Sequence, residues 1–550
     1  MSAALDYTAE AFVLPADKPM GRQSAGESFL KGYVRHSGAS RFTGHVVLTP
    51  DALAFTRQVQ DLSPGAEVRI AKPNALHPVI EEGTLFCFHP VLPLHAWSRR
   101  AVGEAAYSLC GLTHTLASHV VLDAVADMLI APMHDWDALI CPSRAIKGVV
   151  ERIFDDQQAY LTARMGAPAL ARPQLPVIPL GINTDEFTPD EGRRQGWRKR
   201  LGIAENEVAV IYVGRLSLHA KANPLPMYMA LEQAAKATGK KVRLLLVGWF
   251  ANDRIADLFK RGAVELMPSV KLTLVDGTDG DARMGAWAAA DIFFQLSDNI
   301  QESFGLSPVE AMAAQLPAVV SDWDGFRDTI VAGETGFLAP TIQPAGGAGD
   351  EIATRYDAGM WNYDSYLAAA CQSSAVSVKA AADALTGLIQ NPERRLSMGA
   401  AGRKRAQALY DWSAVIPQYL ALWQELAERR KAGAAGPNSG IGAGKPGRTD
   451  PYHMFTSFPT QVLTDETVLV LEAAAKGHDV DTWMARQSAR LIGDVLLGAA
   501  EANALVAMLA DGEMRMGDLI ADVPAEARPI YVRTIGWMLK FAILSVKESG

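Results

Sequence analysis

The chain has 550 residues, of which 49% are hydrophobic and 21% are charged, and its formal net charge is −9. At about 150 residues per domain, this length predicts three to four units. The high apolar content excludes disorder for most of the chain. The mild acidity argues against a protein that binds nucleic acid through bulk charge.

The sequence predicts no membrane span and no signal peptide. Its strongly apolar runs have the length of strands, and Met1–Leu14 lacks a basic region followed by an apolar core. We therefore expect at most peripheral membrane contact. The cysteines show no CxxC spacing, which favours a reducing cytosol and predicts neither a disulfide framework nor a zinc site. They are Cys87, Cys110, Cys141 and Cys371.

Short apolar runs alternate with helical patterns through the first 340 residues. The runs are Thr84–Phe88, Val120–Val125, Leu139–Cys141, Val177–Leu180, Val208–Val213, Lys241–Val247, Lys271–Val275, Ile292–Leu296 and Ala318–Ser321. Val120–Val125 is as compatible with helix as with strand. This alternation predicts parallel sheets covered on both faces, and two Rossmann-like units fit its length better than one.

The junction between these units is expected near Pro176–Asp190, where a strand is followed by a turn-rich segment. We therefore assign 1–185 to a first Rossmann-like domain and 186–405 to a second. The charge run in 193–200 is interpreted as a solvated helix face, with nucleic-acid or lipid contact as the minor alternative.

Three further segments complete the chain. Residues 406–431 carry aromatic and apolar side chains at helical spacing, so they predict a packed helix. Residues 432–449 are rich in Gly, Ala and Pro and predict a flexible linker. Residues 450–550 form a separate module dominated by helical patterns.

The stretch Asp291–Pro340 carries the strongest chemical signal. A buried strand runs into a polar loop, and a helix begins near Ser307–Pro308, with Ser307 as its cap. Such a helix presents free N–H groups to an anion at the carboxyl edge of a parallel sheet. Glu302 and Glu310 flank the turn, and carboxylates accept strong hydrogen bonds from hydroxyl pairs.

These residues resemble the EX7E signature of the retaining glycosyltransferases of family 4. The blocks Gly325–Asp328, Gly336–Leu338 and Val210–Leu216 also match that family's pattern, in the right order. The resemblance covers roughly residues 10–430. It implies a GT-B fold of class α/β, with two Rossmann-like domains facing across a cleft and the helix of residues 406–431 crossing back to the first domain, followed here by the C-terminal, mainly helical module.

The resemblance implies a role for each matching residue on the second domain. Glu310 would hold the ribose of a nucleotide, and Glu302 would lie near the hydroxyls of the transferred sugar. Arg215 and Lys221 would clamp the diphosphate, although this chain has one residue more between them than is common. The donor would also contact Val275 and the backbone amides of Phe304, Gly305 and Leu306.

The first domain is expected to supply the acceptor side. The segment Met20–Glu27 follows a short apolar run, Ala11–Leu14, and resembles the family's glycine-rich first loop, with Gly21 as its donor-side residue. His114 resembles the histidine that reaches the transferred sugar. His89 and Ser143 are further candidates, for which a packing or capping role is equally compatible.

No metal or cofactor is expected. Asp276, Asp279 and Asp281 miss the spacing of a calcium loop, so a plain loop is the better interpretation. Asp322 and Asp324 resemble a DxD metal site but follow a strand, which favours helix capping. A cationic clamp and a helix dipole are sufficient to neutralise a diphosphate.

The implied reaction transfers a sugar from a nucleoside diphosphate to an acceptor hydroxyl with retention, on a glycan, a polysaccharide or a lipid-linked acceptor. A phosphorylase, a sugar-nucleotide epimerase and a non-catalytic scaffold stay open as alternatives. The donor base, the sugar and the acceptor are not predicted.

The module 450–550 shows helical patterns at Asp465–Lys476, Thr482–Leu497, Glu501–Leu509, Met516–Ile520 and Glu526–Lys540, then an apolar end. This order resembles a winged helix. Residues 451–550 hold 13 acidic and 8 basic side chains, which argues against nucleic-acid binding. We expect a module for oligomerisation, protein contact or acceptor docking.

Overall fold

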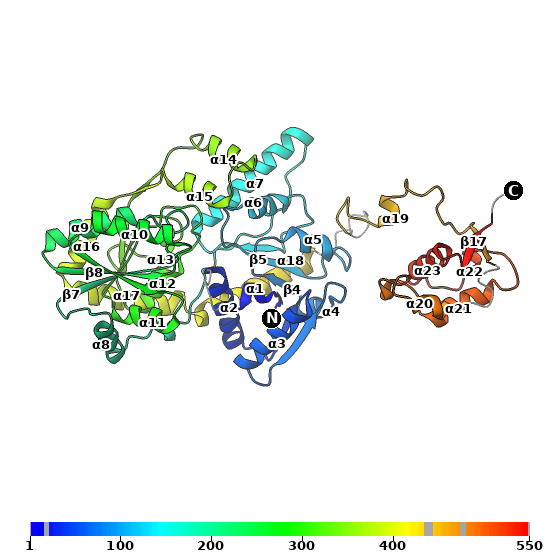
Figure 1. Cartoon of the computed structure of the whole chain (residues 1–550), viewed down its shortest axis with the longest axis horizontal. Helices are drawn as coiled ribbons and strands as arrows, with labels where there is room; N and C mark the ends of the chain where they lie inside the picture. The colour runs from blue at the N-terminus through cyan, green and yellow to red at the C-terminus, as the bar shows by residue number, and fades with distance from the viewer. Residues whose placement is uncertain (1, 16–20, 434–443, 473–479, 548–550) are drawn as a thin grey trace. The chain divides into compact units, whose positions relative to one another are not determined.

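The computed structural model describes residues 2–15, 21–433, 444–472 and 480–547. The chain divides into two compact units, Met1–Lys445 and Pro446–Gly550, and each is described by itself. In the first unit, Figure 1 shows one α/β domain in blue to cyan beside a second α/β domain in green to yellow.

The first sheet has six parallel strands in the order β3-β2-β1-β4-β5-β6. They are β1 (Ala4–Asp6), β2 (Arg41–His45), β3 (Glu67–Ala71), β4 (Thr84–Cys87), β5 (Ser108–Leu112) and β6 (Ala138–Ile140). The helices are α1 (Ala9–Phe12), α2 (Gly21–His36), α3 (Thr49–Leu62), α4 (His77–Glu82), α5 (Pro93–Arg99), α6 (His119–Asp127) and α7 (Arg144–Met165). The strand order reverses between β1 and β4, which is where open α/β sheets bind ligands.

The second sheet repeats this topology with the order β12-β11-β10-β7-β8-β9, again all parallel. Its strands are β7 (Glu207–Val213), β8 (Lys241–Gly248), β9 (Val270–Asp276), β10 (Ile292–Gln295), β11 (Ala318–Ser321) and β12 (Gly336–Ala339). The 3-10 helix η1 (Thr184–Phe187) and the helix α8 (Glu191–Arg200) precede it. The strand order of this sheet reverses between β7 and β10.

The helices that follow are α9 (Pro224–Thr238), α10 (Asp253–Leu266), α11 (Gly280–Ala289), α12 (Leu306–Ala313), α13 (Phe326–Thr329), α14 (Asp350–Asp357), α15 (Tyr363–Cys371), α16 (Val378–Gln390) and α17 (Pro392–Leu409). A two-stranded antiparallel ladder joins β13 (Thr341–Ile342) to β14 (Ala375–Val376). The prediction of two Rossmann-like sheets is thus confirmed.

The helix α18 (Trp412–Gly433) packs against α2 and β5 of the first sheet layer. Trp412 Nε1 donates a hydrogen bond of 2.7 Å to Ser28 Oγ, and the ring of Trp412 lies edge-on to Phe29. Tyr419 and Trp423 are also fully buried among aromatic neighbours. These aromatic side chains therefore belong to the core, which extends into both sheet layers.

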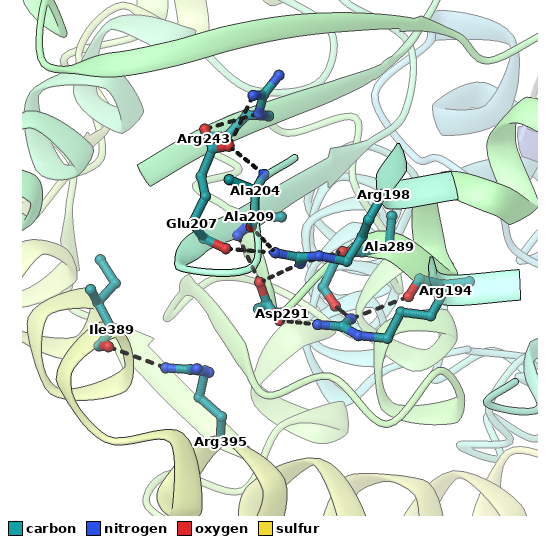
Figure 2. Close-up of polar contacts among 12 residues, drawn as sticks. Arg194, Arg198, Ala204, Glu207, Ala209, Arg243, Ala289, Asp291, Ile389 and Arg395 are labelled. Atoms are coloured by element: carbon teal, nitrogen blue, oxygen red, sulfur yellow. Dashed lines mark hydrogen bonds and ion pairs between the residues drawn. The ribbon is translucent and has the colours of Figure 1, made fainter. Parts of the chain in front are cut away.

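The charge run on α8 differs from the expected solvated face. Arg194 and Arg198 both form ion pairs with Asp291, at 2.5 and 3.1 Å, as Figure 2 shows. Asp291 also accepts the amide N–H of Ala209 on β7 at 2.7 Å. This part of the run anchors α8 to the start of the second sheet, so the solvated-face interpretation is wrong for these two residues.

A second buried pair lies beside this network. Arg243 on β8 makes a two-pronged contact with Glu207, at 3.0 and 2.9 Å, and also donates to the carbonyls of Leu201 and Gly202. Both side chains are almost fully buried. Burial raises the pKa of Glu207, but the hydrogen bonds from Arg243 and from the amide N–H of Ala204, together with the charges of Arg243 and Lys271, hold it below its ordinary value.

Several predicted elements differ from the structure. The strands β1, β2, β3 and β5 were not predicted, because polar residues or glycine interrupt their short apolar runs. Val120–Val125 belongs to α6, and Val177–Leu180 contributes only an isolated bridge to Cys141. The short apolar run Ala11–Leu14 overlaps the short helix α1.

The second unit contains α19 (Pro451–Met454), β15 (Val468–Leu471), α20 (Val480–Met484), η3 (Gly493–Val495), α21 (Ala499–Met508), β16 (Met514–Arg515), α22 (Met516–Leu519), α23 (Arg528–Lys540) and β17 (Leu544–Val546). Its antiparallel sheet has the order β16-β15-β17. The helix predicted over Asp465–Lys476 is wrong where β15 lies. Only the start of Thr482–Leu497 is α-helical, whereas the later helices agree with the prediction.

Most of the predicted linker, residues 434–443, lies outside the described residues, as does Met20. Within the described residues, no helix is both long and apolar enough to cross a membrane.

Candidate functional site

In the loop between β10 and α12, one position has a backbone conformation that favours glycine. Gly305 has φ +83°, and a Cβ there would lie 2.1 Å from Cε1 of Phe326. Gly305 is the N-cap of α12, so the helix begins at Leu306, slightly earlier than predicted. Phe304 is buried beneath the turn.

Ser307 does not cap this helix, which corrects the prediction. Its Oγ donates a hydrogen bond of 3.0 Å to the carbonyl of Val213, at the end of β7. The contact ties the first turn of α12 to the point where the strand order of the second sheet reverses. The free N–H groups of α12 therefore lie at the carboxyl edge of this sheet.

Two cationic side chains, Lys221 and Arg215, contact the polar loop that follows β10. Lys221 Nζ lies 3.2 Å from Oε2 of Glu302, whose side chain is only 7% exposed. Arg215 Nη2 donates to Gln301 Oε1 at 2.9 Å, and Gln301 Nε2 donates to the hydroxyl of Tyr363 at 3.1 Å. The extra residue between Arg215 and Lys221 therefore does not carry Lys221 away from Glu302.

Glu310 lies on α12, near the same lysine. Burial raises the pKa of its carboxyl group to about 7, while the charges of Arg283 and Lys221 act in the opposite direction. Near neutral pH the carboxyl is thus poised between its neutral and ionised forms. A partner that donates hydrogen bonds, such as a pair of hydroxyls, would favour the ionised form.

The remaining residues predicted for this domain lie at other places. Val275 is buried near the end of β9, the strand at one edge of the sheet. The nearby acidic residues have structural partners: Asp276 accepts from Thr278, and Asp279 caps α11 by accepting two amide N–H groups. Asp281 forms surface ion pairs with two arginines of α8.

Gly21, predicted for the glycine-rich first loop, is the exposed first residue of α2. A Cβ at Gly21 would meet no atom within 4 Å, so no close approach requires glycine there. Gly26, one helical turn and a half later, is the position with no space: a Cβ there would lie 2.1 Å from the carbonyl oxygen of Ala11. The tight contact in this segment is therefore between α2 and α1.

His114 follows β5 at the carboxyl edge of the first sheet. Its Nε2 lies 3.0 Å from the carbonyl oxygen of Phe88, to which it donates, and its ring packs against the Phe88 ring. Burial lowers the pKa of His114 to about 4. The imidazole is therefore neutral near pH 7, with its Nε2 proton held by the carbonyl.

Ser143 joins the two sheet layers. As the N-cap of α7, its Oγ accepts the amide N–H of Ile146; the same hydroxyl lies 2.8 Å from the carbonyl of Ser303 and 3.1 Å from Asp324 Oδ1. The capping role and the contact with the second layer thus coexist. The structure brings Ser143 to the loop that contains Glu302.

The DxD-like pair does not cap the helix that follows it, which corrects that prediction. Gly325 is the N-cap of α13 and no side chain caps it, whereas Asp322 accepts from Arg327 at 3.0 Å. Asp324 has φ +42° and receives the hydrogen bond from Ser143. Burial, reinforced by the charge of Glu302, raises the pKa of Asp324 to about 8.

A cluster centred on Asp6, the last residue of β1, was not predicted from the sequence. Asp6 is in register with His45 at the end of β2 and with Cys87 at the end of β4. Three imidazoles approach its carboxylate: His45 Nδ1 at 2.7 Å, His89 Nε2 at 3.1 Å and His95 Nε2 at 3.3 Å. Burial alone would raise the pKa of Asp6, but hydrogen bonds from these histidines hold it well below its usual value.

A signal for this cluster was present in the order Cys87, His89, His95, because these spacings place three metal-ligating side chains around one strand end. The expectation of no zinc site rested on the absence of CxxC spacing, which a site of this composition does not need. His89, which was predicted as a candidate cleft residue, therefore contacts the carboxylate of Asp6.

Residues 193–346, which include Arg215, Lys221, Glu302 and Glu310, match the family model described as "Glycosyl transferases group 1". Among curated relatives, a D-inositol 3-phosphate glycosyltransferase of Geodermatophilus obscurus is 32% identical over 185 residues, covering 31% of this chain and 37% of that protein. A phosphatidyl-myo-inositol mannosyltransferase of Mycobacterium leprae is 33% identical over 251 residues, covering 46% and 53%. The matches thus span about a third to a half of these relatives.

Among solved structures, Anabaena HepE in complex with UDP has a TM-score of 0.50 and 15% identity, with 78% of this chain and 99% of that chain covered. This likeness concerns the fold. Together with the two parallel six-stranded sheets, it confirms the predicted GT-B architecture. The family model and the relatives confirm the resemblance to group 1 glycosyltransferases.

Proposed function

We propose that this chain, as a group 1 glycosyltransferase by resemblance, transfers a sugar from a nucleoside diphosphate to an acceptor hydroxyl with retention of the anomeric configuration. The observation that carries the proposal is the contact of 3.2 Å between Lys221 and Glu302 at the carboxyl edge of the second sheet. Glu310 and the N-terminus of α12 belong to the same edge.

In this proposal, Arg215 and Lys221 neutralise the diphosphate of the donor. In the structure these cations contact Gln301 and Glu302, and a diphosphate would compete with those two side chains for the cations. Guanidinium and ammonium groups form charge-assisted hydrogen bonds with phosphate oxygens. Their charge matters most as the sugar–phosphate bond breaks, because negative charge then grows on the leaving oxygen.

Glu310 would hold the ribose, and Glu302 would hold hydroxyls of the transferred sugar. Ionised carboxylates accept strong hydrogen bonds from vicinal hydroxyls. A ribose contact is made in the ground state and the transition state alike, so it contributes to donor affinity more than to turnover.

Retention would follow from attack on the same face of the sugar that the diphosphate leaves. In this path the departing phosphate takes the proton of the acceptor hydroxyl, so one group serves as leaving group and base. His114, on the acceptor side, is neutral and donates from Nε2 to a carbonyl, so we assign it a positioning role and not that of the base.

The relatives' names favour a polyol acceptor. Two of them act, by name, on D-inositol 3-phosphate and phosphatidyl-myo-inositol. We therefore propose an acceptor hydroxyl on a cyclitol, a glycan or a lipid-linked headgroup. Because HepE is described in complex with UDP, we propose a UDP-sugar as the first donor to test.

A donor screen on the full-length protein tests the transferase. Nucleoside diphosphate release should depend on one sugar nucleotide and increase when a polyol acceptor is added. Lys221→Ala should abolish release, whereas Lys379→Ala, on an exposed surface of α16, should not. Conversion of the donor without acceptor would indicate an epimerase, and dependence on inorganic phosphate would indicate a phosphorylase. No turnover with any donor, despite donor binding, would support the scaffold.

The stereochemistry and the metal requirement are tested on the product. Proton NMR should show retention. Turnover should be equal with and without added magnesium or manganese, since the cationic clamp neutralises the diphosphate. An inverted product, or activity that appears only with manganese, would contradict the proposal.

A further inference from the structure

The cluster around Asp6 has the composition of a transition-metal site. Within the described residues, the ligand atoms of Asp6, Cys87, His89 and His95 all lie within 4.8 Å of one another. A carboxylate, a thiol and two imidazoles are ligands that zinc accepts together, whereas calcium and magnesium prefer oxygen. The set thus indicates the class of ion.

The distances within the cluster approach those of a tetrahedral site. Tetrahedral zinc with bonds of about 2.0–2.3 Å separates its ligand atoms by about 3.3–3.8 Å. Asp6 Oδ2 lies 3.1 Å from His89 Nε2 and 3.3 Å from His95 Nε2. Two edges of the tetrahedron therefore have nearly the required length, and the remaining ligand atoms, including the thiol of Cys87, lie within 4.8 Å and reach tetrahedral positions after a small rearrangement.

The fold holds these ligands from rigid positions. Asp6 and Cys87 are paired in register at the ends of the adjacent strands β1 and β4, so their side chains leave the same face of the sheet. His95 comes from α5, which follows β4 directly. These strands flank the position where the strand order reverses, which is where such sheets bind ligands.

The surroundings also suit an ion. His45 Nδ1 contacts the other oxygen of Asp6 at 2.7 Å, and such an outer hydrogen bond orients a carboxylate ligand. Cys87 is fully buried, whereas His89 is 38% exposed and leaves the cluster accessible from one side.

His89 is the weakest of the four ligands. Its Nδ1 accepts the amide N–H of Val91 at 3.1 Å, so its Nε2 carries the proton. Metal binding at Nε2 would require that this backbone hydrogen bond break. Asp6, Cys87 and His95 are therefore the ligands on which affinity should depend.

We propose that Asp6, Cys87, His89 and His95 form a zinc-binding site at the switch point of the first sheet. It is distinct from the residues proposed to bind the diphosphate and does not depend on the transferase assignment. It revises the expectation, based on the lack of CxxC pairs, that no zinc site exists.

The test uses tag-free, full-length protein expressed with zinc and dialysed against metal-free buffer. Elemental analysis should give about one equivalent of zinc, bound more tightly than about 1 µM. After chelation, cobalt(II) should restore a tetrahedral visible spectrum with a thiolate-to-cobalt charge-transfer band, and zinc should raise the melting temperature of the wild type.

Cys87→Ser and His95→Ala should each lose the metal, and Cys87→Ser should also lose the charge-transfer band. Cys141→Ser, another buried thiol of the first sheet layer, and His77→Ala, an exposed histidine, are the matched controls and should keep both. Failure of the wild type to take up zinc or cobalt would overturn the proposal, even if the variants did not fold. So would zinc binding or a thiolate band that survives Cys87→Ser, or iron or copper in place of zinc.

Discussion

We predict that the half-buried carboxyl of Glu310 makes donor affinity depend on pH. If Glu310 binds the ribose as proposed, its pKa of about 7 means that the proton must leave before the carboxylate can accept two ribose hydrogen bonds. Because the pKa is raised, the neutral form prevails below pH 7 and the binding-competent form above it. Affinity for the nucleoside diphosphate should therefore increase as the pH rises through 7 and level off beyond it.

The size of this effect follows from the pKa. If only the ionised form binds, the dissociation constant at pH 6 should be about tenfold higher than at pH 8, since one pH unit below the pKa leaves about a tenth of the groups ionised. Glu310→Gln removes the charge. At pH 8 it should weaken binding about tenfold to a hundredfold, because hydrogen bonds to charged groups contribute about 1.5–3 kcal/mol.

Isothermal titration calorimetry at pH 6, 7 and 8, with the nucleoside diphosphate that the donor screen selects, measures both quantities. The diphosphate titrates in the same range, so the informative value is the ratio of the dissociation constants of Glu310→Gln and wild type at each pH. This ratio should increase with pH. Glu393→Gln, exposed on α17, should follow the wild type. A ratio that stays constant from pH 6 to pH 8 would refute the ribose role of Glu310.

Four further predictions concern catalysis and stability. Arg215→Ala should lower kcat by about a hundredfold or more with little change in donor affinity, measured by steady-state kinetics, because leaving-group charge grows in the transition state; unchanged kcat would refute the clamp. Gly305→Ala should lower the free energy of unfolding, measured by urea denaturation, by more than about 2 kcal/mol, because Gly305 has a positive φ and a Cβ there would clash with Phe326. Gly346→Ala, where a Cβ meets open space, should not lower it. Asp291→Ala should cost about 3 kcal/mol because it removes the carboxylate partner of two arginines and the acceptor of the Ala209 amide, and Asp281→Ala, on the surface, less than about 1 kcal/mol; equal losses would contradict this account of the network. Deletion of 451–550 should leave donor turnover intact and alter only assembly or activity on the natural acceptor, as size-exclusion chromatography and the release assay would show, and an unfolded remainder would contradict it.

The second sheet was the more predictable half of the fold. Several of its strands contain continuous buried apolar runs, such as Val208–Val213 in β7 and Ile292–Phe294 in β10, and buried parallel strands have this pattern. In the first sheet, Ala4–Asp6 and Arg41–His45 are short, and each ends in a polar residue that serves the Asp6 cluster. Polar residues such as Asp6 and His45 interrupt the apolar pattern by which a buried strand is identified in a sequence.

The residues proposed to bind the donor were identified through the family resemblance, and their roles stay predictions, but the structure does bring Lys221 and Glu302 together. The contact between Lys221 and Glu302 crosses from the loop after β7 to the loop after β10, and the strand pairing of β7 with β10 explains it. The capping roles of Ser307 and Asp324 were predicted wrongly. In each case a local interaction was available, but the side chain instead bonds to another element, Val213 or Ser143.

The Asp6 cluster shows why local spacing was insufficient on the first sheet. Its members come from β1, β2, β4 and α5, and only the order of strands places β1 between β2 and β4. That order puts Asp6 beside His45 on one side and Cys87 on the other, in register. A carboxylate surrounded by three imidazoles and a thiol is thus a property of the sheet topology. Each of the two sheets gathers its polar side chains where its strand order reverses, the first around Asp6 and the second around Glu302.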